Sequence, residues 1–120
     1  MKVVIVDDES DICFILSLEI KASGFNTVTF ESAFAAQKYF ETETADVIIC
    51  DFLMPKMSGL DLFNWLKSKG KNIPFVILTG EPMMDIELLM SNGVTEVLFK
   101  PQDLKKIPDV LNKIYSDQKL

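Results

Sequence analysis

Histidine is absent from the 120-residue sequence, and cysteine occurs only at Cys13 and Cys50. The absence of histidine excludes histidine base catalysis, histidine metal ligands and an internal histidine that donates a phosphoryl group. Any phosphoryl group carried on histidine must therefore come from a partner. Two unclustered cysteines form neither a disulfide framework nor a zinc site. We expect them to be buried free thiols in a reducing compartment.

Long apolar runs and an excess of basic residues are also missing. The apolar stretch at residues 3–6 ends at Asp7 and is too short for a signal peptide, and no run approaches the roughly 20 residues of a membrane span. The 12 Lys and Arg residues are outnumbered by 18 Asp and Glu, which gives a formal net charge of -6. Direct nucleic-acid binding needs a basic patch. We therefore predict a cytoplasmic protein with no nucleic-acid or membrane contacts of its own.

The composition is that of an ordinary globular domain, with 48% hydrophobic and 25% charged residues. Residues 1–120 are expected to form a single domain, long enough to bury a real core. Short runs rich in β-branched or aromatic residues predict buried parallel strands. The predicted strands lie at residues 2–6, 26–30, 46–50, 74–78 and 95–99.

Helical patterns separate these strands. The first helix is expected at residues 10–23, with Ser10 or Asp8 as its N-cap and Gly24 as its stop. Ile86, Leu89 and Met90 are expected to form the apolar side of the fourth helix. The other helices are expected after a Ser32 cap, between a Ser58 cap and Gly70, at residues 83–91, and from about residue 107 after a tight turn.

Strands that alternate with helices form right-handed βαβ units and a parallel sheet covered on both faces. The predicted class is therefore α/β, a doubly wound five-stranded parallel sheet. Its strand order is either the flavodoxin-like (β/α)5 order 2-1-3-4-5 or a truncated Rossmann order. In the first order, strands one and three are neighbours at the switch point, which places Asp7 and Asp8 beside Asp51.

A charged or hydroxyl residue stands directly after the first, third, fourth and fifth predicted strands. Asp7 and Asp8 follow the first strand and Asp51 follows the third. Thr79 follows the fourth strand and Lys100 follows the fifth. Such side chains gather at the carboxyl edge of the sheet, where open α/β folds bind their ligands. The sequence thus predicts one crevice suited to a divalent metal ion and a phosphoryl group.

Magnesium is the metal that this set of residues suits, because it prefers oxygen ligands and usually binds one or two carboxylates, several waters and phosphate. Asp8 and Asp51 can supply direct carboxylate ligands, and Asp7 can hold a metal-bound water. Three crowded carboxylates raise one another's pKa. The crowding argues for a bound cation or for Lys100 as the counter-charge.

Asp51 is the best candidate nucleophile, because an aspartate at the end of the central strand can attack phosphorus and form an acyl phosphate. Mg²⁺ would neutralise the equatorial oxygens of the transferring group. Lys100 would pair with one phosphate oxygen, and Thr79 could donate a hydrogen bond to another.

Four motifs carry these residues. They are Val6-Asp7-Asp8-Glu9, Asp51 followed by Pro55 and Gly59, Leu78-Thr79-Gly80, and Phe99-Lys100-Pro101. Together they resemble the receiver domain of bacterial two-component response regulators. One such motif is weak, but all of them in order at predicted strand ends are highly specific. The resemblance covers essentially the whole chain, and with it we predict the flavodoxin-like strand order 2-1-3-4-5.

The resemblance implies that Asp51 is the phosphoacceptor. It implies that Mg²⁺ binds to Asp8, to Asp51 and to the backbone carbonyl of Leu53. It also implies that Asp7 supports this metal site.

Switching is also implied by the resemblance. Thr79 would reorient towards the phosphoryl group, Lys100 would bridge it, and the bond before Pro101 would be cis. The phosphoryl group would come from a histidine kinase or a histidine phosphotransfer protein. The surface built from the fourth helix, fifth strand and fifth helix would then change and act on a downstream output protein or effector domain. The sequence is compatible with a stand-alone receiver that acts through protein contacts and with a receiver domain excised from a larger protein.

The chain departs from the family pattern at two positions. Val97 stands where the family usually has an aromatic residue that moves with the threonine, and Phe99 lies on the same strand face by alternation. Leu53 places an apolar side chain where many relatives carry a polar one near the attacking water. With Glu81 as the other neighbour of the phosphoryl group, we expect a changed autodephosphorylation rate.

Three alternative functions compete with a phosphorylation-switched signalling domain. The first is a receiver-like protein-binding module without phosphoryl transfer. The second is a Mg²⁺-dependent phosphohydrolase, but such enzymes usually carry a carboxylate where this chain has Leu53, so we do not expect an enzyme. The third is a flavin-binding electron carrier, which needs a Ser/Thr/Gly-rich phosphate loop after the first strand. This chain has Asp7-Asp8-Glu9 there, and these acidic residues would repel a phosphate.

Overall fold

Five strands form one parallel sheet in the order β2-β1-β3-β4-β5. The computed structural model describes residues 1–81 and 85–118. The order 2-1-3-4-5 is confirmed, and the truncated Rossmann order is wrong for this chain. The strands are β1 (Lys2–Val6), β2 (Asn26–Phe30), β3 (Val47–Asp51), β4 (Phe75–Thr79) and β5 (Glu96–Phe99).

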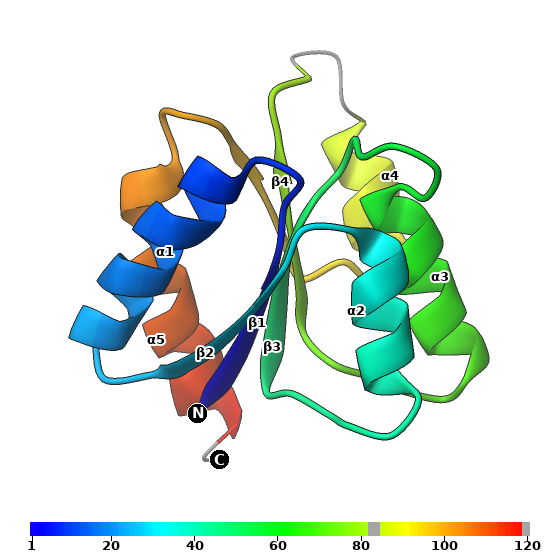
Figure 1. Ribbon diagram of the computed structural model, residues 1–120, viewed down its shortest axis with the longest axis horizontal. Coiled ribbons are helices and arrows are strands. Elements are labelled where there is room, and N and C mark those ends of the chain that lie inside the picture. The colour runs from blue at the N-terminus through cyan, green and yellow to red at the C-terminus, as the bar shows by residue number, and fades with distance from the viewer. Residues whose placement is uncertain (82–84, 119–120) are drawn as a thin grey trace.

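Helices cover both faces of the sheet (Figure 1). The helices are α1 (Ser10–Ala22), α2 (Ala33–Phe40), α3 (Gly59–Ser68), α4 (Ile86–Ser91) and α5 (Ile107–Gln118), the last preceded by a 3-10 turn at Leu104–Lys106. α1 and α5 pack on one face, and α2, α3 and α4 pack on the other. None of the helices in the described ranges combines the length and apolar character that a membrane crossing requires.

The sheet separates two apolar cores. Along β1, Val4 and Val6 face the core under α2 and α3, while Val3 and Ile5 face the core under α1 and α5. This alternation is the period of two of a strand, and burial on both faces explains why the central strands are apolar throughout. Every residue of β3 and β4 is buried. The central strands therefore hold their carboxyl ends in fixed positions.

Asp51 and Thr79 are the last residues of β3 and β4, so these two strands lie one residue further along than predicted. The register explains the difference. Asp51 is level with Leu78 of β4, and Thr79 is level with Phe99 of β5. Pairing with a neighbouring strand extends each strand to include its terminal polar residue, which a hydrophobic pattern does not assign to the strand.

The helix caps agree with the sequence in part. Ser32 and Ser58 cap α2 and α3, and Ser58 forms a reciprocal capping box with Asp61. The cap predicted for α1 is wrong, because Glu9 occupies the N-cap position without a side-chain hydrogen bond. Gly24 ends the α1 region with a positive φ of 94°, as predicted.

The expected helix at 83–91 begins at Ile86, and residues 82–84 lie outside the described ranges. Its predicted apolar side is only partly right. Leu89 is buried, but Ile86 and Met90 are exposed, and so is Leu88. In this short helix only Leu89 is buried, so the helical spacing of Ile86, Leu89 and Met90 did not by itself decide which side chains the core covers.

Gly59 opens α3 immediately beside the end of β3. Its N–H donates to the carbonyl of Phe52 at 2.9 Å. A Cβ at this position would overlap the carbonyl oxygen of Asp51 and lie 3.2 Å from the Sγ of Cys50. Only glycine allows α3 to start so close to the strand that presents Asp51.

Substitution of Gly59 by alanine is expected to lower the free energy of unfolding by about 1–3 kcal/mol, because the backbone must shift to make room for the methyl group. Urea unfolding measures this change. Gly80→Ala is the matched control, since a Cβ at Gly80 meets nothing within 4 Å. Equal stability of the two variants would contradict the proposed close approach.

Candidate functional site

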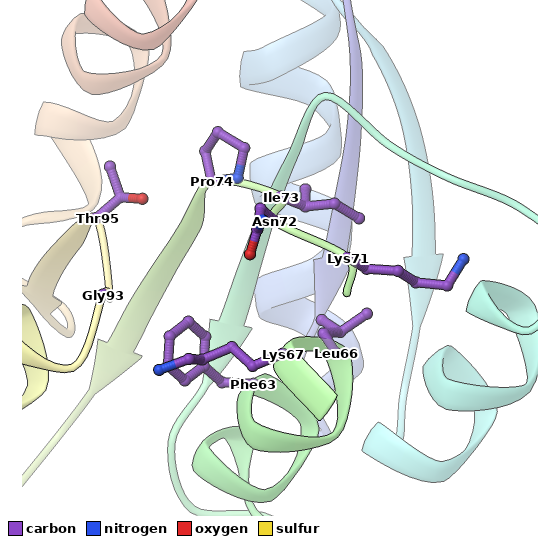
Figure 2. Close-up of a pocket in the computed structure, with 9 residues that line it drawn as sticks. All are labelled: Phe63, Leu66, Lys67, Lys71, Asn72, Ile73, Pro74, Gly93 and Thr95. Carbon is purple, nitrogen blue, oxygen red and sulfur yellow. The ribbon is translucent and has the colours of Figure 1, made fainter. Parts of the chain in front are cut away.

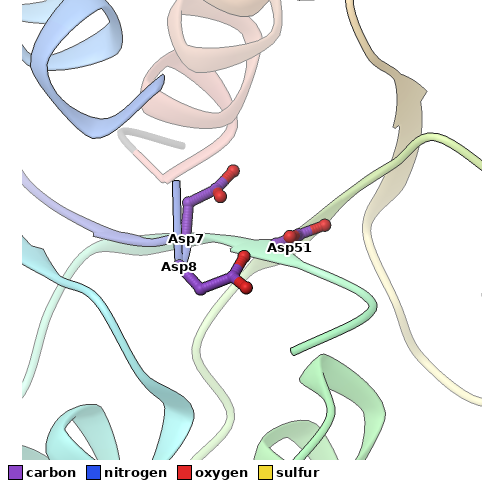
Figure 3. Close-up of side chains that lie close together, drawn as sticks. All are labelled: Asp7, Asp8 and Asp51. Carbon is purple, nitrogen blue, oxygen red and sulfur yellow. The ribbon is translucent and has the colours of Figure 1, made fainter. Parts of the chain in front are cut away.

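Three carboxylates meet at the carboxyl edge of the sheet. Asp7 and Asp8 follow β1, Asp51 ends β3, and these two strands are hydrogen-bonded neighbours. One carboxylate oxygen from each residue lies within 4.8 Å of the others. Figure 3 shows the three side chains converging on one region. The predicted juxtaposition is confirmed, with Asp7 and Asp51 buried and Asp8 exposed.

Lys100 reaches this cluster from the end of β5. Its Nζ lies 3.2 Å from Oδ2 of Asp7 and 3.4 Å from Oδ2 of Asp51. Its backbone N–H donates to the carbonyl of Thr79 at 2.9 Å, which extends the pairing of β4 with β5. The peptide bond between Lys100 and Pro101 is cis, as expected. The predicted counter-charge is therefore in place.

Thr79 is buried at the end of β4, between the strands that carry Asp51 and Lys100. Its Oγ1 accepts a hydrogen bond of 2.9 Å from the backbone N–H of Glu81. Within the described ranges, no hydrogen bond joins Thr79 to the three carboxylates. Its hydroxyl proton is thus available to a group bound in the crevice.

The two departures from the family pattern differ in exposure. Leu53, two residues after Asp51, is 53% exposed. Val97 is buried in the core under α3, and Phe99 packs against that same core. The expectation that Val97 and Phe99 share one face of β5 is confirmed.

The contacts of Glu9 and of the two cysteines with the site were not predicted from the sequence. Oε1 of Glu9 lies 3.4 Å from Nζ of Lys100, so three carboxylates surround this ammonium group. Cys13 and Cys50 are buried free thiols, as expected. Their Sγ atoms donate to the backbone carbonyls of Asp7 and Asp51, each at 3.3 Å. The position of Glu9 two residues after Asp7 was the only available signal.

Burial and like charge govern the ionisation of the cluster. Burial, followed by repulsion from Asp7, raises the pKa of Asp51 from 3.8 to about 6 although Lys100 opposes this. Burial also raises the pKa of Asp7. For Lys100, burial favours the neutral amine, but Asp7 and Asp51 outweigh it and raise the pKa of the ammonium group. The cluster therefore carries more negative charge than one lysine offsets.

The donor set fits a divalent cation. The cluster offers only oxygen ligands, from carboxylates that include one exposed and two buried side chains. Hard cations such as Mg²⁺ and Ca²⁺ prefer oxygen, and Mg²⁺ typically keeps some of its waters, which the exposed side of Asp8 leaves room for. A cation there would also relieve the repulsion that raises the pKa of Asp51.

Asp51→Asn is expected to stabilise the protein at pH 7.5 without divalent cations, by up to about 3 kcal/mol. Folding raises the pKa of Asp51, so the folded state favours the protonated carboxyl. The contribution of Asp51 to the free energy of unfolding is therefore fully present below pH 4 and is lost as the pH rises through about 6. Urea unfolding in chelator at pH 4 and pH 7.5 tests this. The exposed Asp117→Asn is the control. The quantity to compare is the gain in free energy of unfolding of the variant over the native chain. A gain at pH 7.5 no larger than the gain at pH 4 would contradict the charge argument.

Comparison with known proteins agrees with the fold and the site. The response regulator receiver domain model matches residues 3–112. The chain is 30% identical over 93% of its length to the DNA-binding transcriptional regulator NtrC of Klebsiella pneumoniae, and it spans 24% of that relative. It is also 30% identical, over 83% of its length, to the alkaline phosphatase synthesis transcriptional regulatory protein PhoP of Bacillus subtilis, and it spans 42% of that protein.

Solved structures show the same architecture. A response regulator receiver domain protein from Clostridium thermocellum superimposes with a TM-score of 0.87 at 29% identity, covering 98% of this chain and 96% of that one. The response regulator TrrA of Thermotoga maritima, solved in complex with Mg²⁺ and BeF, gives a TM-score of 0.83 at 26% identity, covering 94% and 97%. Since the family match contains every residue of the acidic cluster together with Lys100, the chain belongs to the response regulator receiver domains.

Proposed function

We propose that Asp51 accepts a phosphoryl group from a phosphohistidine of a partner protein. The observation that carries the proposal is the position of its carboxylate, which lies beside Asp7 and Asp8 and 3.4 Å from the Nζ of Lys100. An oxygen of Asp51 attacks the phosphorus, the P–N bond to the donor imidazole breaks, and the electron pair leaves with that ring. The product is an aspartyl phosphate on this chain.

The metal in this proposal is Mg²⁺, and the relative TrrA was solved with Mg²⁺ and BeF. Asp8, Asp51 and the backbone carbonyl of Leu53 would hold it, and Asp7 would hold a metal-bound water. When bound, the ion supplies positive charge to the oxygens of the transferring group. Asp7 also keeps Lys100 at the site through their 3.2 Å ion pair.

Lys100 and Thr79 stabilise the phosphoryl group in this scheme. The ammonium of Lys100 already lies 3.4 Å from Oδ2 of Asp51, so it can exchange that contact for a phosphoryl oxygen with little movement. The hydroxyl of Thr79 donates to a second oxygen. Because these contacts exist only with the phosphoryl group present, they supply the difference in free energy that a switch requires.

The output surface in this proposal is formed by α4, β5 and α5. β5 links it to the site directly, since Lys100 follows this strand. α4 exposes the apolar side chains of Ile86, Leu88 and Met90 and has one buried residue, Leu89. A short helix with few core contacts repacks at low cost, so it suits a surface that changes on phosphorylation.

The role that follows is signalling, not steady enzymatic turnover. The family is one of signalling domains. We propose that residues 1–120 act as one receiver domain in the cytoplasm, that a histidine kinase or histidine phosphotransfer protein donates the phosphoryl group, and that an output protein or effector domain responds. The chain spans less than half of the length of the relatives NtrC and PhoP, so either kind of output agrees with it.

Incubation with acetyl phosphate and Mg²⁺ is expected to add one phosphoryl group to the native chain, seen as intact mass. Asp51→Asn and chelator should each abolish the gain, because they remove the nucleophile and the metal. Asp11→Asn, an exposed aspartate of α1, is the matched control and should still be labelled. Labelling of Asp51→Asn would refute the assignment. If neither the native chain nor any variant is labelled by acetyl phosphate or by a histidine kinase, the result would favour a receiver-like protein-binding module without phosphoryl transfer.

Mg²⁺ is expected to stabilise the native chain against urea by about 1.4 kcal/mol at ten times its dissociation constant. Asp8→Asn should reduce this gain to near zero at the same concentration, since a direct carboxylate ligand is lost. Asp11→Asn should retain it. Equal Mg²⁺ responses in the Asp8 and Asp11 variants would remove Asp8 from the metal site.

A further inference from the structure

A hollow of about 270 Å³ lies at the opposite edge of the sheet from the acidic cluster. It is bounded by the end of α3, the segment that enters β4 and the turn between α4 and β5 (Figure 2). Its apolar floor includes the buried side chains of Phe63 and Leu66 and the half-buried Ile73 and Pro74. The half-buried Ile73 and Pro74 supply the exposed part of this floor, because Phe63 and Leu66 are buried.

The polar groups around this floor can donate hydrogen bonds, and Oγ1 of Thr95 already accepts one of 3.0 Å from the backbone N–H of Phe75. Lys67 places its Nζ 5.4 Å from the centre of the Phe63 ring. In Figure 2 the side chains of Thr95 and Asn72 border the open space of the hollow from two sides, whereas Lys71 extends away from this space. Within the described ranges, the carboxamide of Asn72 has no protein hydrogen-bond partner. An ammonium, a carboxamide and a hydroxyl thus border one apolar surface.

The charge of the hollow is opposite to that of the whole chain. Acidic residues outnumber basic ones by 18 to 12 in the sequence. Among the described residues that line the hollow there are two lysines, Lys67 and Lys71, and no Asp or Glu, and Lys67 is the one whose side chain lies over the floor. Carboxylates or phosphates are the groups that such a donor set recognises.

We propose that this hollow binds a small organic anion, in which a carboxylate or phosphate is attached to an apolar, ring-sized body. The anion would contact Nζ of Lys67, the carboxamide of Asn72 and the hydroxyl of Thr95. The body would lie against Ile73 and Pro74, the half-buried apolar residues of the floor. The inference is independent of phosphoryl transfer at Asp51, because the two sites share no residue.

Lys67 also connects the hollow to α4. Its Nζ donates to the backbone carbonyl of Asn92 at 2.8 Å, and Asn92 is the C-cap of that helix. Lysine at a helix C-terminus stabilises the free carbonyl groups there. An anion that draws the ammonium of Lys67 into the hollow competes with this bond. Binding would therefore alter the end of a helix that has one buried residue, Leu89.

Nuclear magnetic resonance titration of the full chain in chelator tests the proposal, with phenylacetate as the probe and phenylacetamide as its neutral counterpart. Phenylacetate should bind with a dissociation constant in the millimolar range, as expected of a fragment, and at least about threefold more tightly than the amide. The shifted amide signals should include those of Gly93 and Thr95. Phenyl phosphate, titrated in parallel, distinguishes a preference for phosphate from one for carboxylate.

Lys67→Met keeps the stem over the Phe63 ring and removes the charge. It should abolish the preference for phenylacetate over the amide, and Lys67→Arg should restore it. Lys69→Met, an exposed lysine of the same segment that does not line the hollow, should leave the preference unchanged. The proposal is overturned if Lys67→Met, with a native-like spectrum, retains the preference, or if the shifts map elsewhere. That result would leave the assignment of Asp51 as the phosphoacceptor unchanged.

Discussion

Repulsion among carboxylates at one edge of the sheet is the constraint on which the rest of the structure depends. Asp7 and Asp51 are buried within reach of each other, and burial works against the charge of both. Lys100 offsets part of this charge from the end of β5. The free chain therefore holds an electrostatic cost that a cation can relieve. Affinity for a divalent ion follows from this cost, because the ion removes repulsion that folding has imposed.

The fold supplies rigid support for that arrangement. The central strands are buried on both faces, so their ends cannot move apart to lower the repulsion. Gly59 lets α3 start against the carbonyl of Asp51, and the thiols of Cys13 and Cys50 donate to the carbonyls of Asp7 and Asp51. Rigid positioning of this kind is what charge stabilisation at a reacting phosphoryl group requires.

The helix that we propose to respond, α4, is built differently. α4 has six residues, one of them buried, and it displays apolar side chains to solvent. It is held at its C-terminal end by the contact from Lys67 to Asn92, far from the acidic cluster at the other edge of the sheet. A loosely packed helix between a charged site and a donor-lined hollow can respond to ligands at either edge.

The sequence by itself determined the strand pattern, the helix caps at Ser32 and Ser58, and the set of residues at the carboxyl edge. Strand periodicity and parallel topology carry that information, because every strand end must arrive at the same edge. Only the tertiary structure decided the third carboxylate of Glu9 beside Lys100 and the exposure of the apolar side chains of α4. These depend on contacts between segments distant in the chain. A local pattern gives the face of a helix, but the length of that helix and the neighbours it meets decide which side chains are covered.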